Sequence, residues 1–107
     1  MAYINIRLSI CEWDIGGKDD TTSYKADYEV TKVGEVLYAN KNDTKRYVFK
    51  VMAISPDEIV LDCDCPPAII HLRKGEPYSH TYSFEGYEDH DGCVWNGEDE
   101  NIYVVWQ

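Results

Sequence analysis

The sequence predicts an all-β fold, a single-domain antiparallel sandwich or barrel of seven to eight short strands over residues 1–107. Apolar and polar residues alternate with a period of two in several segments, which is typical of half-buried strands. Turn-forming residues separate these segments about every ten residues, and no segment sustains helical spacing. A chain of 107 residues is close to the usual size of one domain, so we expect one domain around one core.

The first two strands follow from the clearest alternation in the chain. Each has four apolar residues on one side and polar residues on the other, with a Gly16–Gly17 turn between the two strands. The apolar positions are Ile4, Ile6, Leu8 and Ile10 in the first strand, and Tyr24, Ala26, Tyr28 and Val30 in the second.

A hairpin is predicted next, with strands over Val36–Ala39 and Lys45–Ile54 joined by an Asn- and Asp-rich turn. In its second strand, one face should carry Tyr47, Phe49, Val51 and Ala53. In residues 30–37, Val30, Val33 and Leu37 also fit one face of a helix, but Gly34 and the β-branched residues disfavour a helix there.

The remaining strands are set off by proline and glycine turns. Pro56 fits a type I turn, and Pro66 and Gly75 mark two further breaks. The predicted strands are Ile59–Cys63, Ile69–Arg73, Tyr78–Phe84 and Ile102–Trp106. An open edge at the last of these would allow a homodimer to form by strand pairing.

Charge is distributed very unevenly along the chain. The formal net charge is −10, and all of it lies in residues 55–107, where twelve acids face only Arg73 and Lys74. Between Glu85 and Glu100 there are seven carboxylates and no Lys or Arg. Clustered carboxylates complement a basic surface and steer association with it, so the sequence predicts a basic protein partner.

The expected function is that of a small acidic, non-enzymatic binding protein, acting as an inhibitor or as an immunity-like or anti-defence antagonist. Aromatic residues inside a charged loop are typical of interface anchors, which points to Tyr87 and Trp95. The candidate partner-binding residues are Tyr87, Glu88, Asp89, Asp91, Trp95, Glu98, Asp99 and Glu100.

The alternative is a β domain that binds calcium or a carbohydrate through the acidic loop 87–98. Counted from Tyr87, the later positions of an EF-hand loop are filled by Asp89, Asp91, Gly92 and Glu98. The first position is Tyr87 instead of Asp, and the flanking segments are predicted strands where the motif needs helices. No metal or other cofactor is therefore expected.

Other function classes find little support in the residues. Cys63 and Cys65 are two apart without a second pair, which disfavours a zinc site, and no catalytic motif singles out a His or Ser. Ten dispersed bases against twenty acids disfavour direct nucleic-acid binding. Without an apparent signal peptide or an apolar run of membrane length, we expect a cytoplasmic protein that does not bind a membrane.

Overall fold

The computed structural model describes residues 2–17, 19–41, 44–64, 67–86 and 96–107, and every helix or strand assigned in these ranges is a β-strand. The all-β prediction is therefore confirmed. In chain order the strands are β1 (Ala2–Asp14), β2 (Asp19–Val30), β3 (Val36–Lys41), β4 (Thr44–Ile54), β5 (Ile59–Asp64), β6 (Pro67–Leu72), β7 (Tyr78–Glu85) and β8 (Asn96–Trp106).

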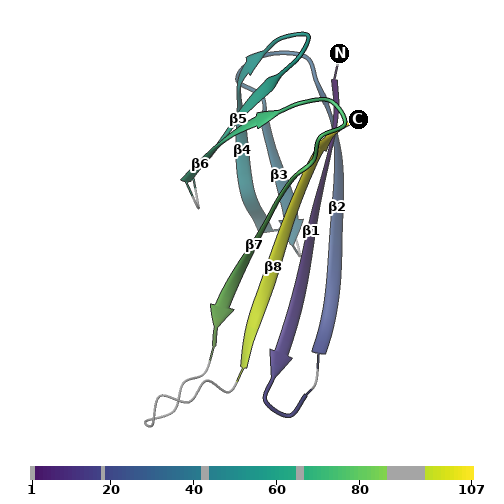
Figure 1. The fold of residues 1–107 in the computed structure, drawn as a ribbon. Helices are drawn as coiled ribbons and strands as arrows, with labels where there is room; N and C mark the ends of the chain where they lie inside the picture. The colour runs from purple at the N-terminus through teal and green to yellow at the C-terminus, as the bar shows by residue number, and fades with distance from the viewer. Residues whose placement is uncertain (1, 18, 42–43, 65–66, 87–95) are drawn as a thin grey trace.

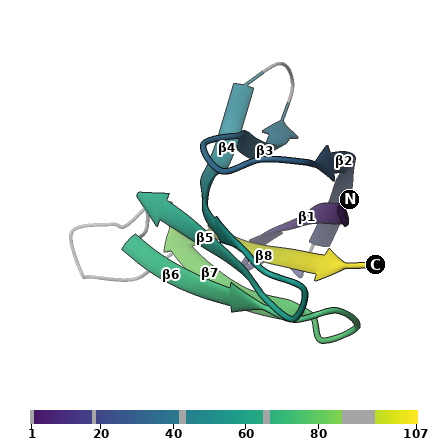
Figure 2. The same ribbon diagram turned by 90° about the horizontal axis from the view of Figure 1, so that it is seen from above.

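The strands form two four-stranded sheets, which we call sheet A (order β2-β1-β8-β7) and sheet B (order β3-β4-β5-β6). Every neighbouring pair within a sheet is antiparallel. The two sheets do not close into a barrel, so the fold resembles a sandwich (Figures 1 and 2). Because β8 lies between β1 and β7, the prediction that Ile102–Trp106 forms an open edge was wrong.

The core fills the space between the inner faces of the two sheets. In β1 the inner side chains Ile4, Ile6, Leu8 and Ile10 are at most 2% exposed, as their alternation predicts. Burying an aliphatic or aromatic side chain of this size stabilises the fold by about 1.5–3 kcal/mol. Sheet B covers these positions with Leu37, Phe49, Val51, Leu61, Ile70 and Leu72.

Irregular pairing of β4 changes one predicted face. Tyr47, Phe49 and Val51 are buried as expected, whereas Ala53 is exposed. The register between β4 and β5 shifts between Val51 and Ala53, and this bulge turns the end of β4 outward. A bulge of this kind is not visible in a simple alternation of apolar residues.

The connection between β2 and β3 is a turn and not the helix that residues 30–37 also allowed. Gly34 has a φ of 95°, a conformation that favours glycine, and its N–H donates to the carbonyl of Val51 at 2.8 Å. Pro67 opens β6, an edge strand of sheet B, which is one of the few strand positions where proline is tolerated.

Sheet A is much longer than sheet B. β1, β2 and β8 have 13, 12 and 11 residues, whereas β3, β5 and β6 have 6 each. The molecule measures 53 × 25 × 22 Å, and one end of sheet A extends beyond sheet B, away from the chain termini (Figure 1). The candidate functional site lies at this uncovered end.

Candidate functional site

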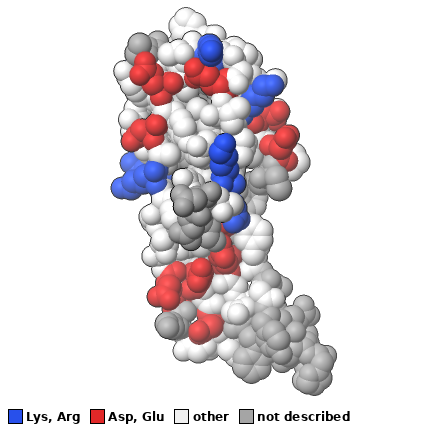
Figure 3. Space-filling view, turned by 180° about the vertical axis from the view of Figure 1, so that it is seen from behind, with Lys and Arg blue, Asp and Glu red and all other residues white. Residues whose placement is uncertain are grey.

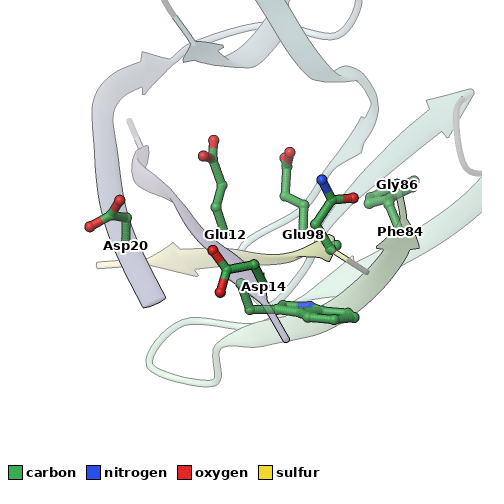
Figure 4. Close-up of a pocket in the computed structure, with 9 residues that line it drawn as sticks. Glu12, Asp14, Asp20, Phe84, Gly86 and Glu98 are labelled. Carbon is green, nitrogen blue, oxygen red and sulfur yellow. The ribbon is translucent and has the colours of Figure 1, made fainter. Parts of the chain in front are cut away.

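The uncovered end of sheet A carries a row of carboxylates on its inner face. Glu12 of β1 lies directly opposite Asp20 of β2 on one side and Glu98 of β8 on the other. Figure 4 shows Glu12 and Glu98 projecting in the same direction from neighbouring strands, with Asp20 on the strand beyond. Strands in a sheet are about 4.8 Å apart, so the three carboxylates span about 10 Å.

These carboxylates line a cleft of about 540 Å³. Asp14 adds a fourth acid to its lining, and the described residues that line it include no Lys or Arg. In Figure 3 acidic side chains lie over both the upper and the lower part of the visible face, whereas basic side chains appear only over its upper and middle part. The cleft therefore concentrates negative potential at one end of the molecule.

Aromatic side chains form the apolar part of the lining. Phe84 of β7 lies opposite Glu98, and its side chain is 48% exposed. Trp13 lies opposite Gly97, and a side chain at position 97 would collide with the Trp13 indole. Gly97 is thus required for the indole to lie across β8 beside the cleft.

A buried charge network marks the boundary between the cleft and the core. Glu100, the next inner residue of β8 after Glu98, is 0% exposed. Nη2 of Arg46 lies 3.0 Å from both carboxylate oxygens of Glu100, and the Tyr47 hydroxyl donates to Oε2 at 3.0 Å. A buried carboxylate is tolerated only when it is paired, so β4 supplies the cation and the donor that Glu100 needs.

A β-bulge brings both partners to the same carboxylate. Consecutive strand residues normally point to opposite faces, yet Arg46 and Tyr47 both reach Glu100. The register between β3 and β4 shifts between Leu37 and Ala39, and opposite this point Tyr47 has a φ of 53°. This left-handed conformation is uncommon for a residue other than glycine, and here it turns the phenol toward the core.

Tyr47 remains a hydrogen-bond donor well above neutral pH. Burial raises the pKa of its phenol, and the negative charge of Glu100 raises it further.

Three aromatic rings pack beside this hydroxyl. The Tyr47 ring stacks on the Tyr82 ring with 5.8 Å between their centroids, and the centroid of the His80 ring lies 4.3 Å from that of Tyr82. Burial also raises the pKa of Tyr82. The aromatic layer packs beside the charge network at the place where the covered part of sheet A ends.

The structure places the predicted partner-binding residues in different environments. Glu98 lines the cleft, whereas Asp99 points to the outer face and accepts a hydrogen bond from Ser83 at 2.7 Å. Glu100 is buried and bound by Arg46, so the expectation that these three acids share one exposed surface was wrong. They belong to a strand, in which successive side chains alternate between faces. Five predicted residues lie outside the described ones: Tyr87, Glu88, Asp89, Asp91 and Trp95.

The sequence prediction did not include Glu12, Asp14, Asp20 or Phe84. Glu12 continues the inward positions of the first strand after Ile10, and Asp20 does the same for the second strand. Extending the period of two past the last apolar residue would have found both. The calcium and carbohydrate alternative depends on the loop 87–98, most of which lies outside the described residues.

No family model, curated protein or solved structure matches the chain. The site is therefore interpreted from its own geometry. Within the described ranges, no three or more His, Cys, Asp and Glu side chains are grouped so that they could hold a metal ion. The same ranges contain no helix long and apolar enough to cross a bilayer.

Proposed function

We propose that this chain is a non-enzymatic binding protein whose acidic cleft receives Lys and Arg side chains of a basic protein partner. The observation that carries the proposal is the cross-strand row of Asp20, Glu12 and Glu98 on the uncovered inner face of sheet A. The wider class that suits such a surface is an antagonist that covers a basic site on another protein.

Electrostatics supports a cationic occupant. Like charges directly opposite each other on neighbouring strands destabilise a sheet, by about 0.2–1 kcal/mol per pair. The row contains two such pairs, Asp20 with Glu12 and Glu12 with Glu98. A cation placed between them replaces repulsion by attraction, and a cleft with protein walls focuses the potential that draws it in.

The dimensions of the cleft favour several cationic side chains over one small ion. The carboxylates spread over about 10 Å across three strands, and the cleft has a volume of about 540 Å³. The exposed ring of Phe84 offers an apolar surface beside Glu98. The aliphatic stem of Lys or Arg, or a guanidinium group over the ring, would pack against it.

The test uses an arginine-rich peptide as a defined cationic probe. Isothermal titration should show binding that weakens steadily as salt is added, because exposed charges are screened. The triple variant Glu12→Gln, Asp20→Asn, Glu98→Gln should bind the peptide about tenfold more weakly. The same peptide with citrulline in place of arginine, which has nearly the same shape but no charge, should not bind.

A charge-matched control separates the cleft from the net charge of the molecule. The variant Asp19→Asn, Glu29→Gln, Asp57→Asn also removes three carboxylates, all from exposed positions outside the cleft lining. It should keep most of the affinity. Equal losses in the two triple variants, or equal binding of the arginine and citrulline peptides, would show that the cleft is not the binding site.

A further inference from the structure

The outer faces of the two sheets have different chemistry. On sheet A, polar side chains bond to one another: Asn5 donates to Asp27 at 2.7 Å, and Asn101 donates to Thr81 at 3.0 Å. On sheet B the outer face has the His71–Glu58 contact at 3.0 Å, and it exposes four large apolar side chains. These are Val36 at 49%, Val48 at 41%, Met52 at 47% and Ile69 at 60% exposed. Exposed apolar residues gathered on one face are typical of an interaction surface.

One row of sheet B residues crosses all four strands of this face. Val36 of β3 pairs with Lys50 of β4, Lys50 pairs with Asp62 of β5, and Asp62 pairs with Ile69 of β6. The row therefore has the order apolar, positive, negative, apolar. Lys50 and Asp62 lie directly opposite each other, yet the ion pairs of the described residues do not include one between them. Both charges remain available to a partner.

From this pattern we infer that the outer face of sheet B binds the same face of a second copy of this chain. The row is complementary to itself under a two-fold axis that runs parallel to the strands between β4 and β5. Such an axis places Lys50 over Asp62 of the other copy, and Asp62 over its Lys50. It also places Val36 over Ile69 in both directions. Two-fold interfaces require this reciprocal relation between residues.

On one side of this row, the same axis also exchanges two apolar positions. Ala53 of β4 pairs with Val60 of β5, so the positions on either side of the axis are both apolar. Four charges at the centre then alternate in sign, because each Lys50 has Asp62 beside it in its own chain and another Asp62 across the interface. No described strand covers this face in Figures 1 and 2. Sheets stacked in this way pack about 10 Å apart, within reach of a Lys side chain.

The size of the face sets the expected strength. Four strands about 4.8 Å apart and six residues long at about 3.3 Å per residue give a face of roughly 15 by 20 Å. A standard stable interface buries about 800 Å² on each partner, so this dimer should be weak and reversible. The surface is on the opposite sheet from the acidic cleft, and the inference is independent of the proposed function.

Sedimentation velocity of the full chain from about 10 µM to about 1 mM, at a physiological salt concentration, tests the inference. The wild-type protein should shift from monomer toward dimer as concentration rises. Lys50→Asp and Asp62→Lys should each stay monomeric, because each places like charges across the axis. Mixing the two single variants should restore association, and the double variant Lys50→Asp, Asp62→Lys should also dimerise.

Control variants separate the effect of the sheet B face from the effects of charge and of misfolding. Lys25→Asp and Glu29→Lys make the same kinds of charge change at exposed positions of β2 and should dimerise as the wild type does. Circular dichroism checks that each variant is folded, and Ile69→Lys gives a second disruption that does not alter the central charges. A wild-type chain that is monomeric throughout, a dimer that ignores these substitutions, or single variants that fail to associate when mixed would overturn the inference.

Discussion

The inner face of sheet A has two halves that follow the same alternation but carry opposite chemistry. In the covered half, β1 places Ile4, Ile6, Leu8 and Ile10 toward sheet B. In the uncovered half, the next inward residue is Glu12, which lies between Asp20 and Glu98. Hydrogen bonding between the strands therefore continues where the core ends, and the inward side chains change from apolar to acidic at that point.

Glu100 belongs to both halves, since it has the chemistry of the uncovered half and the burial of the covered one. The substitution Arg46→Met removes the cation that pairs with Glu100, and we expect it to lower the free energy of unfolding more than any other change proposed below. Removing one partner of a buried ion pair costs about 3–5 kcal/mol, because the remaining charge is left uncompensated. Glu100 is fully buried but the Arg46 side chain is 37% exposed to screening water, so the loss should lie near the lower end of that range. Urea denaturation of the variant should show this loss in the free energy of unfolding.

Two further variants sharpen that measurement. The double variant Arg46→Met, Glu100→Leu should recover much of the lost stability, since a buried pair is often replaced by apolar residues at little cost. Lys45→Met removes the adjacent exposed cation, which lies 4.7 Å from the centroid of the Tyr38 ring, and should cost less than about 1 kcal/mol. Similar losses from Lys45→Met and Arg46→Met would show that Glu100 does not depend on its partner.

A smaller effect should come from Tyr47→Phe, which removes the hydroxyl that donates to Glu100. Loss of a hydrogen bond to a charged group should lower the free energy of unfolding by about 1.5–3 kcal/mol. Tyr24→Phe, a partly buried tyrosine packed against the core, is the matched change outside the charge network. An equal loss in both variants would contradict a special role for the Tyr47 hydroxyl.

Tyr47→Phe should also change the response to alkali. Burial and then the charge of Glu100 raise the pKa of Tyr47 in the folded chain. Its contribution to stability is therefore complete below the pKa of an unfolded tyrosine, about 10, and falls as the pH rises above it. Unfolding curves between pH 9 and pH 12 should show a shallower decline for the variant, and an unchanged slope would contradict this assignment.

The smallest effect should be a gain, from Glu12→Gln in the uncovered half. This change removes the central charge of the acidic row and relieves repulsion from both neighbours, so stability should rise by about 0.2–1 kcal/mol. The gain should shrink in high salt because the side chain is exposed. Glu29→Gln, at an exposed position of β2 outside the row, should show no comparable gain, and a loss of stability in Glu12→Gln would contradict the proposed repulsion.

The same comparison explains what the sequence could and could not predict. The covered half was predictable because burial requires alternating apolar residues, as in Ile4 to Ile10. The uncovered half carries no such signal, so the alternation does not place Asn96–Asn101 in the last strand, and the sequence prediction puts the acids of this segment on one surface. The Arg46–Glu100 pair was out of reach because it joins residues 54 apart in the chain through a β-bulge. Neither the acidic end of the last strand nor the Arg46–Glu100 pair follows from the local propensity of its residues.

The positions of two tryptophans give each half of sheet A its own optical reporter. Trp106 is 8% exposed and packs in the core, whereas the Trp13 indole lies across Gly97 beside the cleft. In a Trp95→Phe background, fluorescence emitted at longer wavelength should come mainly from Trp13, since water shifts indole emission to the red. A ligand that binds between the carboxylates should then alter the fluorescence of Trp13 and leave the fluorescence of Trp106 unchanged.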